Sequence, residues 1–472
     1  MPLRHIDEAN LDYYLVLLDS DGNERREQDG SMLSETLSQA VPDGVTDVFV
    51  SSHGWKGDIP AAISQYNSWI GAMAAQAVDR DRARKLDPDF KALIVGVHWP
   101  SLPWGTEDTG AALLGDEESG EFADEQQMDA DELMQRYSER IADTPAARTA
   151  LATILAAADD DEVEAHLADG VLPDQLERAY QTLFDQAGLG LGGATAAPGS
   201  DQQAFAPISI ISEWTSAAGG PAQPADSEHP GLLGGRSGRG IKDALLMPVR
   251  QMSFWSMKHR ACHVGETGVH SLLIELQNNA PDARFHLMGH SFGCIVVSAA
   301  ISGPLDQGTV TLRLPRPVHS LILVQGALSL WSFAESIPFP PNLPGYFRPI
   351  DVAPALVSGP IVTTRSTFDH AVGTFFPLGA SLGDDLLLGD GLPEFGGVGA
   401  FGLQGTAPGT THDAAVLAAD AEYGFEAGHI YNIDASTVIR HGSWPSGAHS
   451  DIAHPQIAHM FWQAALSGIA NS

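Results

Sequence analysis

A series of short apolar segments, each about the length of a strand, constrains the fold of this 472-residue chain more than any other feature. Most of them are apolar throughout, without the alternation that marks a strand with one face in water. They cover residues 13–18, 45–51, 92–98, 285–289, 321–324, 361–364 and 429–433. Strands buried on both faces occur mainly in parallel sheets that helices cover, so the chain is expected to form such a sheet.

Segments with a helical pattern lie between several of these strands. Residues 61–78 have an amphipathic pattern, and the segments 269–276, 295–300 and 457–469 also indicate helices. Strands that alternate with helices predict an α/β fold, with a mostly parallel central sheet and helices on both faces. The Asp21-Gly22 pair that follows the first strand is a typical hairpin turn signal.

A long insertion interrupts this order. It opens with an acidic stretch and continues with helical patterns, in one of which Leu133, Tyr137 and Ile141 share a face. Residues 188–240 are rich in Gly, Pro and Ser and predict a flexible loop, and residues 379–409 form a second glycine-rich excursion. The predicted domains are a core of residues 1–100 and 247–472 and an inserted helical or irregular cap of residues 101–246.

The overall composition excludes several classes of function. The formal net charge is −35 at pH 7, from 25 Lys and Arg against 60 Asp and Glu. A surface this acidic repels phosphate backbones, so no nucleic-acid partner is expected; it would suit a salty environment or simply keep the protein soluble. Two cysteines without metal-site spacing predict neither a disulfide framework nor a zinc site. The chain has no signal-like start and no apolar run of about 18 residues, which predicts no membrane span and a cytoplasmic location.

One short motif carries the strongest chemical signal. The segment Gly289-His290-Ser291-Phe292-Gly293 fits the pattern G-x-S-x-G, with an apolar strand before it and a helical segment after it. Such a chain turns sharply from strand to helix, which exposes the Ser291 hydroxyl, and the two glycines remove side chains where the turn is tightest. Because the start of the helix points N–H groups at the reacting centre, the Phe292 amide is placed to stabilise an oxyanion. Ser291 is therefore the predicted nucleophile.

This motif in its context resembles the α/β-hydrolase superfamily, in which GHSFG is a usual form of the nucleophile turn. The resemblance covers about residues 10–100 and 250–472 and implies the α/β-hydrolase fold. It also implies the order oxyanion loop, nucleophile, acid and histidine along the chain. Residues 51–55, Ser-Ser-His-Gly-Trp, follow a predicted strand where that loop is expected, and the Trp55 amide becomes the implied second oxyanion donor. A plain turn is the alternative for this segment.

The acid of a catalytic triad is expected after a late strand, and Asp369 follows the strand at 361–364. An ionised Asp there would orient the catalytic imidazole and stabilise its protonated form. Asp369 could instead cap a helix that starts near Ala371, because Asp is a favoured N-cap. Glu335 is the main alternative acid and Asp351 a weaker one. The position in the chain favours Asp369.

The loop before the last helical segment is rich in histidine. It holds His441, His449 and His454. We select His449 as the base, because it lies early in this loop and resembles the His-Ser-Asp-Ile form of superfamily members. His454 is the alternate base, although it precedes Pro455, which is expected to begin the helix. His449, Asp451 and His454 match no strong metal-site template, so no metal site is predicted.

Two apolar segments lie near these residues in the predicted fold. Residues 252–262 are rich in aromatic side chains and methionine, and we interpret them as a helix packed in the core rather than as a wall of the substrate pocket. Residues 99–104 follow a strand at its carboxyl end, which is the ligand-binding side of an open α/β sheet. They are therefore candidates for the pocket lining.

The resemblance implies a serine hydrolase that cleaves a carboxylic ester through a covalent acyl-enzyme, as a carboxylesterase or lipase does. This chemistry needs no cofactor, and the expected partner is a small-molecule or lipid-like ester. Amidase, thioesterase or peptidase activity on the same residues is the first alternative, because the fold does not choose the substrate. A non-catalytic binding protein on this fold is the second, and a protein-docking role for the acidic cap is the third.

Overall fold

The structure is a computed structural model. It describes residues 3–26, 30–34, 37, 44–55, 59–101, 129–202, 204–218, 239–306, 309–338, 342–352, 356–375, 392–442 and 447–470. Within these residues the central feature is a nine-stranded sheet with the order β1-β2-β4-β3-β5-β8-β9-β11-β10. Every neighbouring pair is parallel except β1 and β2. The chain therefore has the α/β class that its apolar segments predict.

The strands of this sheet are β1 (Leu3–Ile6), β2 (Leu11–Leu17), β3 (Asp47–Ser52), β4 (Ala92–His98), β5 (Arg284–His290), β8 (Ser320–Val324), β9 (Ile361–Arg365), β10 (Thr411–Ala415) and β11 (Ile430–Asp434). A separate hairpin consists of β6 (Leu305–Asp306) and β7 (Thr309–Val310). All seven predicted strands are present. The sequence pattern missed the two edge strands β1 and β10. In the case of β10, the strand is mostly exposed and has no apolar run. The predicted turn at Asp21-Gly22 is also present, with Leu18 bridged to Glu24 in antiparallel register.

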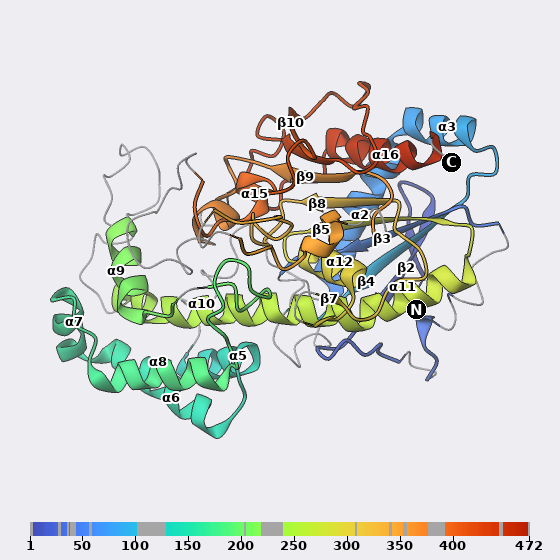
Figure 1. The fold of residues 1–472 in the computed structure, drawn as a ribbon. Helices are drawn as coiled ribbons and strands as arrows, with labels where there is room; N and C mark the ends of the chain where they lie inside the picture. Colours follow the sequence, from blue (N-terminus) through green and yellow to red (C-terminus); the bar gives the residue numbers. More distant parts are fainter. Residues whose placement is uncertain are drawn as a thin grey trace.

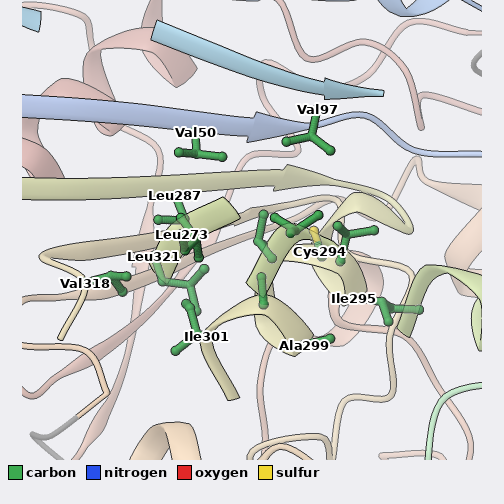
Figure 2. Packing of buried hydrophobic residues seen from close by; sticks show 14 of the residues in the cluster. Val50, Val97, Leu273, Leu287, Cys294, Ile295, Ala299, Ile301, Val318 and Leu321 are labelled. Atoms are coloured by element: carbon green, nitrogen blue, oxygen red, sulfur yellow. The ribbon is translucent and has the colours of Figure 1, made fainter. Parts of the chain in front are cut away.

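Helices cover both faces of the sheet (Figure 1). One face carries α2 (Ile59–Ala75), α3 (Ala77–Leu86) and α16 (Pro455–Ala470). The other carries α10 (Arg239–Val264), α11 (His270–Asn279) and α12 (Gly293–Ser302). Figure 2 shows this second layer, where Leu273 of α11 lies beside Leu287 of β5 and Leu321 of β8, while Ile295 and Ala299 of α12 belong to the same buried cluster. Strands between two such layers have no face in water, which is why they read as continuous apolar runs.

A π-helix, Gly265–Val269, joins α10 to α11. A Cβ at Gly265 would lie 2.5 Å from the carbonyl oxygen of Val296, so glycine lets this segment approach α12 closely. The remaining described helical segments outside the insertion are α13 (Arg348–Val352), the π-helix Ala371–Phe375 and α15 (Val398–Phe401).

The insertion contains its own helical cluster. Its helices are α5 (Ala130–Arg140), α6 (Pro145–Ala156), α7 (Asp161–Ala168), α8 (Asp174–Gln186) and α9 (Pro207–Ala218), with a 3-10 turn at Ala157–Asp159. Leu133, Tyr137 and Ile141 are all buried, as their shared face predicts. They pack with the first half of α10, and Figure 1 shows α5, α6 and α8 beneath that helix. Because α10 is continuous, the predicted boundary at residue 246 falls inside a helix.

The described parts of the predicted loop at 188–240 contain a helix and packed contacts. The Gly192 amide donates to the Ser200 carbonyl over 2.9 Å, and Asp201 forms a buried ion pair with Lys258 of α10. Residues 207–218 form α9. Glycine and proline content alone therefore misses packing that depends on a distant helix. Residues 219–238, the acidic stretch before α5 and residues 379–391 of the second glycine-rich segment lie outside the described residues.

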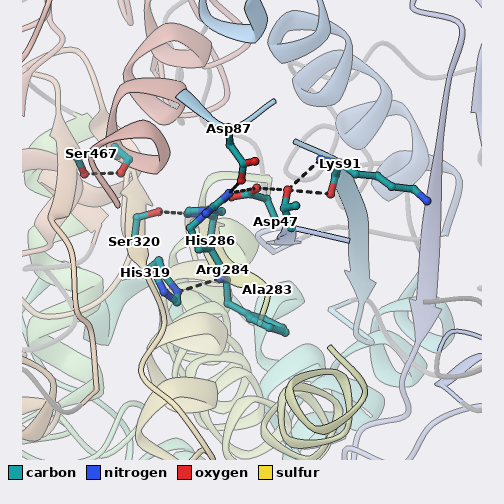
Figure 3. Close-up of polar contacts among 12 residues, drawn as sticks. Asp47, Asp87, Lys91, Ala283, Arg284, His286, His319, Ser320 and Ser467 are labelled. Carbon is teal, nitrogen blue, oxygen red and sulfur yellow. Dashed lines mark hydrogen bonds and ion pairs between the residues drawn. The ribbon is translucent and has the colours of Figure 1, made fainter. Parts of the chain in front are cut away.

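A buried polar network joins the amino ends of the central strands (Figure 3). Arg284 of β5 donates two hydrogen bonds, of 2.8 and 2.7 Å, to Asp47 of β3, and it also contacts Asp87 over 2.7 Å. His286 lies 3.0 Å from Asp47 through Nε2 and 2.9 Å from the Ser320 hydroxyl through Nδ1. Burial raises the pKa of Asp47, but hydrogen bonds from His286 and Arg284 outweigh it and hold the pKa below the usual range.

Candidate active site

The turn after β5 holds the predicted nucleophile. Ser291 has a φ of 56°, one of the few non-glycine residues of the described chain in the left-handed region. A Cβ at Gly289 would lie 2.4 Å from the Gly293 carbonyl oxygen, and one at Gly293 would lie 2.2 Å from the Ser52 carbonyl oxygen. Both glycines are therefore needed for the tight turn, as the motif predicts. A strained backbone of this kind costs about 1–3 kcal/mol and persists where the surroundings impose it.

The structure brings Ser291, His449 and Asp369 into one hydrogen-bonded chain. His449 Nε2 lies 2.7 Å from Ser291 Oγ, and His449 Nδ1 lies 2.8 Å from Asp369 Oδ2. The carboxylate is an acceptor, so Nδ1 carries the proton and Nε2 is free to accept one from the serine. The Asp369 side chain is fully buried, while the His449 side chain is 13% exposed. The chain thus runs from a fully buried carboxyl group through a mostly buried ring to Ser291, which is itself 5% exposed.

Asp369 makes the contacts that both of its predicted roles require. Besides contacting His449, its Oδ1 accepts a hydrogen bond of 3.0 Å from the Val372 amide at the start of the Ala371–Phe375 π-helix. The capping contact fixes the carboxylate in one orientation, which leaves Oδ2 directed at the imidazole. The N-cap interpretation therefore complements the triad interpretation.

The alternative residues are engaged elsewhere. Glu335 lies 3.7 Å from Arg348, and Asp351 lies 2.6 Å from the same guanidinium. His454 is 2.8 Å from Asp451, whose other oxygen accepts the backbone N–H groups of Arg440 and His441. The contacts of Asp451 organise the loop before α16, which begins at Pro455 as predicted.

The loop after β3 lies against the nucleophile. A Cβ at Gly54 would be 2.6 Å from the Cβ of Ser291, so only glycine allows this approach. In the described part of the chain, the backbone N–H groups of Trp55 and Phe292 donate to no other group. They are the two amides that the sequence predicts as oxyanion donors, and a free N–H beside the serine is what that role requires.

A buried histidine holds this loop in place. The Trp99 amide donates to His53 Nε2 over 3.3 Å, and His53 Nδ1 lies 2.7 Å from the Gly54 carbonyl oxygen, so Nδ1 carries the proton. Burial lowers the pKa of His53 to about 4, which keeps the ring neutral. The Tyr66 hydroxyl accepts a hydrogen bond of 2.9 Å from the backbone N–H of His53. Trp99 is fully buried and stacks on His53, so it supports the loop instead of lining a pocket; residues 102–104 lie outside the described residues.

Sequence reasoning missed a second histidine at the site. His290 Nε2 lies 2.9 Å from the main-chain carbonyl oxygen of His449, and its Nδ1 accepts from the Gln65 amide over 3.2 Å. Burial, with the nearness of His449, lowers the pKa of His290 to about 3. A neutral ring therefore lies beside His449 without opposing a positive charge on it. The only sequence signal was the place of His290 inside the motif, which does not reveal a partner 159 residues away.

Aromatic rings pack beside the two free amides. The ring centroids of Trp55 and Phe292 are 5.8 Å apart, and Phe254 of α10 lies 5.0 Å from Phe292. The guanidinium of Arg140, at the end of α5, lies 5.9 Å from the Trp55 centroid. The core interpretation of residues 252–262 holds for most of that segment, for example the fully buried Met257. Phe254 is half-buried and contacts Phe292 and Trp55 beside the site.

The described residues contain no cluster of three or more side chains that could hold a metal ion. They also include no helix long and apolar enough to cross a membrane. In comparisons with known proteins, no family model matches the chain, and no curated protein or solved structure matches it either.

Proposed function

We propose that the protein is a serine hydrolase of the α/β-hydrolase fold that cleaves carboxylic esters. The observation that carries this proposal is the chain Ser291–His449–Asp369, with distances of 2.7 and 2.8 Å, on a strained turn between a central strand and a helix. The order Ser, Asp, His along the sequence and the glycines of the turn support the same fold.

The mechanism follows from the geometry. Ser291 Oγ attacks the ester carbonyl while His449 Nε2 takes its proton, and Asp369 orients the ring and stabilises its positive charge. The negative charge on the carbonyl oxygen is held by the Trp55 and Phe292 amides. His449 then gives the proton to the leaving alcohol, which leaves an acyl group on Ser291. Water, activated by His449 in the same way, releases the acid and restores the serine.

The aromatic rings favour an apolar group in the substrate. Trp55 and Phe254 are half-buried and pack against the fully buried Phe292 next to the free amides, so an acyl chain or an apolar alcohol would bury its area against these two rings. A small-molecule or lipid-like ester fits this surface. Amide, thioester and peptide bonds could be cleaved by the same residues, and matched substrates of each kind would separate them.

The test is intact-mass analysis after treatment with a fluorophosphonate, which forms a bond from Ser Oγ to phosphorus and releases fluoride. We expect one adduct on the wild type and none on Ser291→Ala. Ser320→Ala is the matched control, because Ser320 also contacts a histidine but is fully buried within β8. Absence of an adduct on folded wild type would overturn the proposal and favour a non-catalytic binding protein.

A further inference from the structure

Gln325 has an unusual backbone at the carboxyl end of β8. It follows Val324 directly and has a φ of 45°, which a residue with a side chain rarely adopts. Its amide N–H donates to the Thr364 hydroxyl over 2.9 Å. A Cβ at Gly399 would lie 2.8 Å from the Gln325 main chain, so a second loop closes over it. Neighbouring elements thus hold Gln325 in a conformation that its own sequence does not favour.

The hydrogen bonds of the Gln325 side chain fix its orientation. The Thr364 hydroxyl donates to Oε1 over 2.9 Å, and Nε2 donates to the Gly399 carbonyl over 3.1 Å and to Asp369 Oδ2 over 2.8 Å. A carbonyl and a carboxylate can only accept, so the nitrogen must face both of them. The residue is fully buried. No other orientation of the amide satisfies these partners.

Asp369 therefore receives three donors. His449 and Gln325 share Oδ2, and the Val372 amide reaches Oδ1. The contrast with Asp47 is chemical, because Asp47 is paired with the cation of Arg284. A cation neutralises a carboxylate, whereas a neutral amide orients it and leaves its full charge to act on the imidazole.

The geometry points to Gln325 as a positioning residue that holds Asp369 in line with His449 without neutralising it. This inference rests on the proposed function. Loss of the amide leaves a buried carboxylate oxygen one donor short, and a hydrogen bond to a charged group contributes enough to change a rate about 10- to 100-fold. The effect should appear in the bond-making step, because the hydrogen bonds of the Gln325 side chain go to Asp369, Gly399 and Thr364.

The experiment measures inactivation by a fluorophosphonate as separate values of kinact and KI. We expect Gln325→Leu to lower kinact about 10- to 100-fold and to leave KI within about twofold. Gln277→Leu is the matched control, because Gln277 is also buried and makes two hydrogen bonds, to Arg316 on the far side of the core. It should leave both constants unchanged.

Two results would overturn the inference: an unchanged kinact, or changes in kinact and KI by similar factors, which would indicate a distorted site. If Gln325→Leu does not fold, Thr364→Val tests the inference in its place. This substitution removes the hydroxyl that orients the Gln325 side-chain amide and keeps the shape of the side chain at position 364. We then expect a smaller fall of kinact at unchanged KI, and an unchanged kinact would overturn the inference. Wild type that forms no adduct contradicts the proposed function itself, so the two failures are distinguishable.

Discussion

Two Asp–His–Ser chains lie at opposite ends of the same sheet. At the amino ends of the strands, Asp47, His286 and Ser320 are linked by distances of 3.0 and 2.9 Å. At the carboxyl ends, Asp369, His449 and Ser291 are linked by 2.8 and 2.7 Å. The residue types and distances are nearly the same, so they do not by themselves distinguish a reactive site from a structural network.

The difference lies in the backbone, the charge and the access to solvent. Ser320 lies within a strand and all three side chains of its chain are fully buried, whereas Ser291 lies on a left-handed turn with free amides beside it. Asp47 is bound by Arg284, while Asp369 has neutral donors besides His449. A serine becomes a candidate nucleophile only when the turn presents it and the carboxylate keeps its charge.

The largest expected effect separates the two Asp–His–Ser chains. We expect His449→Ala to lower the rate of fluorophosphonate inactivation about 10⁴-fold or more, because the serine loses its base. The free energy of unfolding should fall by about 1–3 kcal/mol, because the ring is mostly buried and its loss leaves Asp369 one donor short. Ser320→Ala should keep the wild-type rate. Equal losses in both variants would contradict the distinction.

The second prediction reverses the comparison. Asp47→Ala should lower the free energy of unfolding by about 3–5 kcal/mol, because it leaves Arg284 and His286 without their buried carboxylate. Inactivation per folded molecule should stay at the wild-type rate. Urea denaturation measures the first quantity. Asp87→Ala, which removes a partly exposed partner of Arg284, should cost about 1 kcal/mol or less. Similar costs for both variants would show that burial of Asp47 does not matter.

The third prediction concerns the close approach at the nucleophile. Gly54→Ala should lower the inactivation rate about 100-fold, because the new Cβ would lie 2.6 Å from the Cβ of Ser291 and displace the loop or the serine. Gly71→Ala is the control, since a Cβ there meets nothing within 4 Å inside α2. It should keep the rate and add about 0.5–1 kcal/mol of stability. An unchanged rate in Gly54→Ala would contradict the geometry.

The smallest expected effect concerns pH. Burial lowers the pKa of His53 and of His290 to about 4 and about 3, below the ordinary value of 6.5. Below pH ~6.5 the unfolded chain binds protons that these folded rings do not, so stability falls as the pH falls toward the folded values. At pH 5 each ring should cost about 2 kcal/mol relative to pH 7.

Urea denaturation at pH 5, 6 and 7 checks this prediction. His290→Gln should reduce the slope without abolishing it, because His53 and His319, whose pKa values are lowered to about 4, remain. A slope that stays the same in this variant would mean that His290 is not held neutral. The Asp47 network provides a contrast, because Asp47 has a lowered pKa and gives stability that is lost only in stronger acid.

The sequence by itself determined the α/β class and the residues of the candidate site. The apolar runs predicted seven strands, because a strand that is buried on both faces has apolar side chains at nearly every position. Ser291 was predicted from a local turn, and Asp369 and His449 from their order along the chain. The structure places these three side chains in contact, and their catalytic roles remain a prediction.

Only the tertiary structure decided which neighbours hold these residues. Gln325 and Asp369 are 44 residues apart, and His290 and His449 are 159 apart. It also decided that residues 188–202 are packed. Likewise, only the fold shows that Asp47, His286 and Ser320 form a buried hydrogen-bonded network. The physical reason is that period and turn chemistry are properties of a short segment. A hydrogen bond between distant side chains depends on where the whole fold places them, and no local pattern encodes that position.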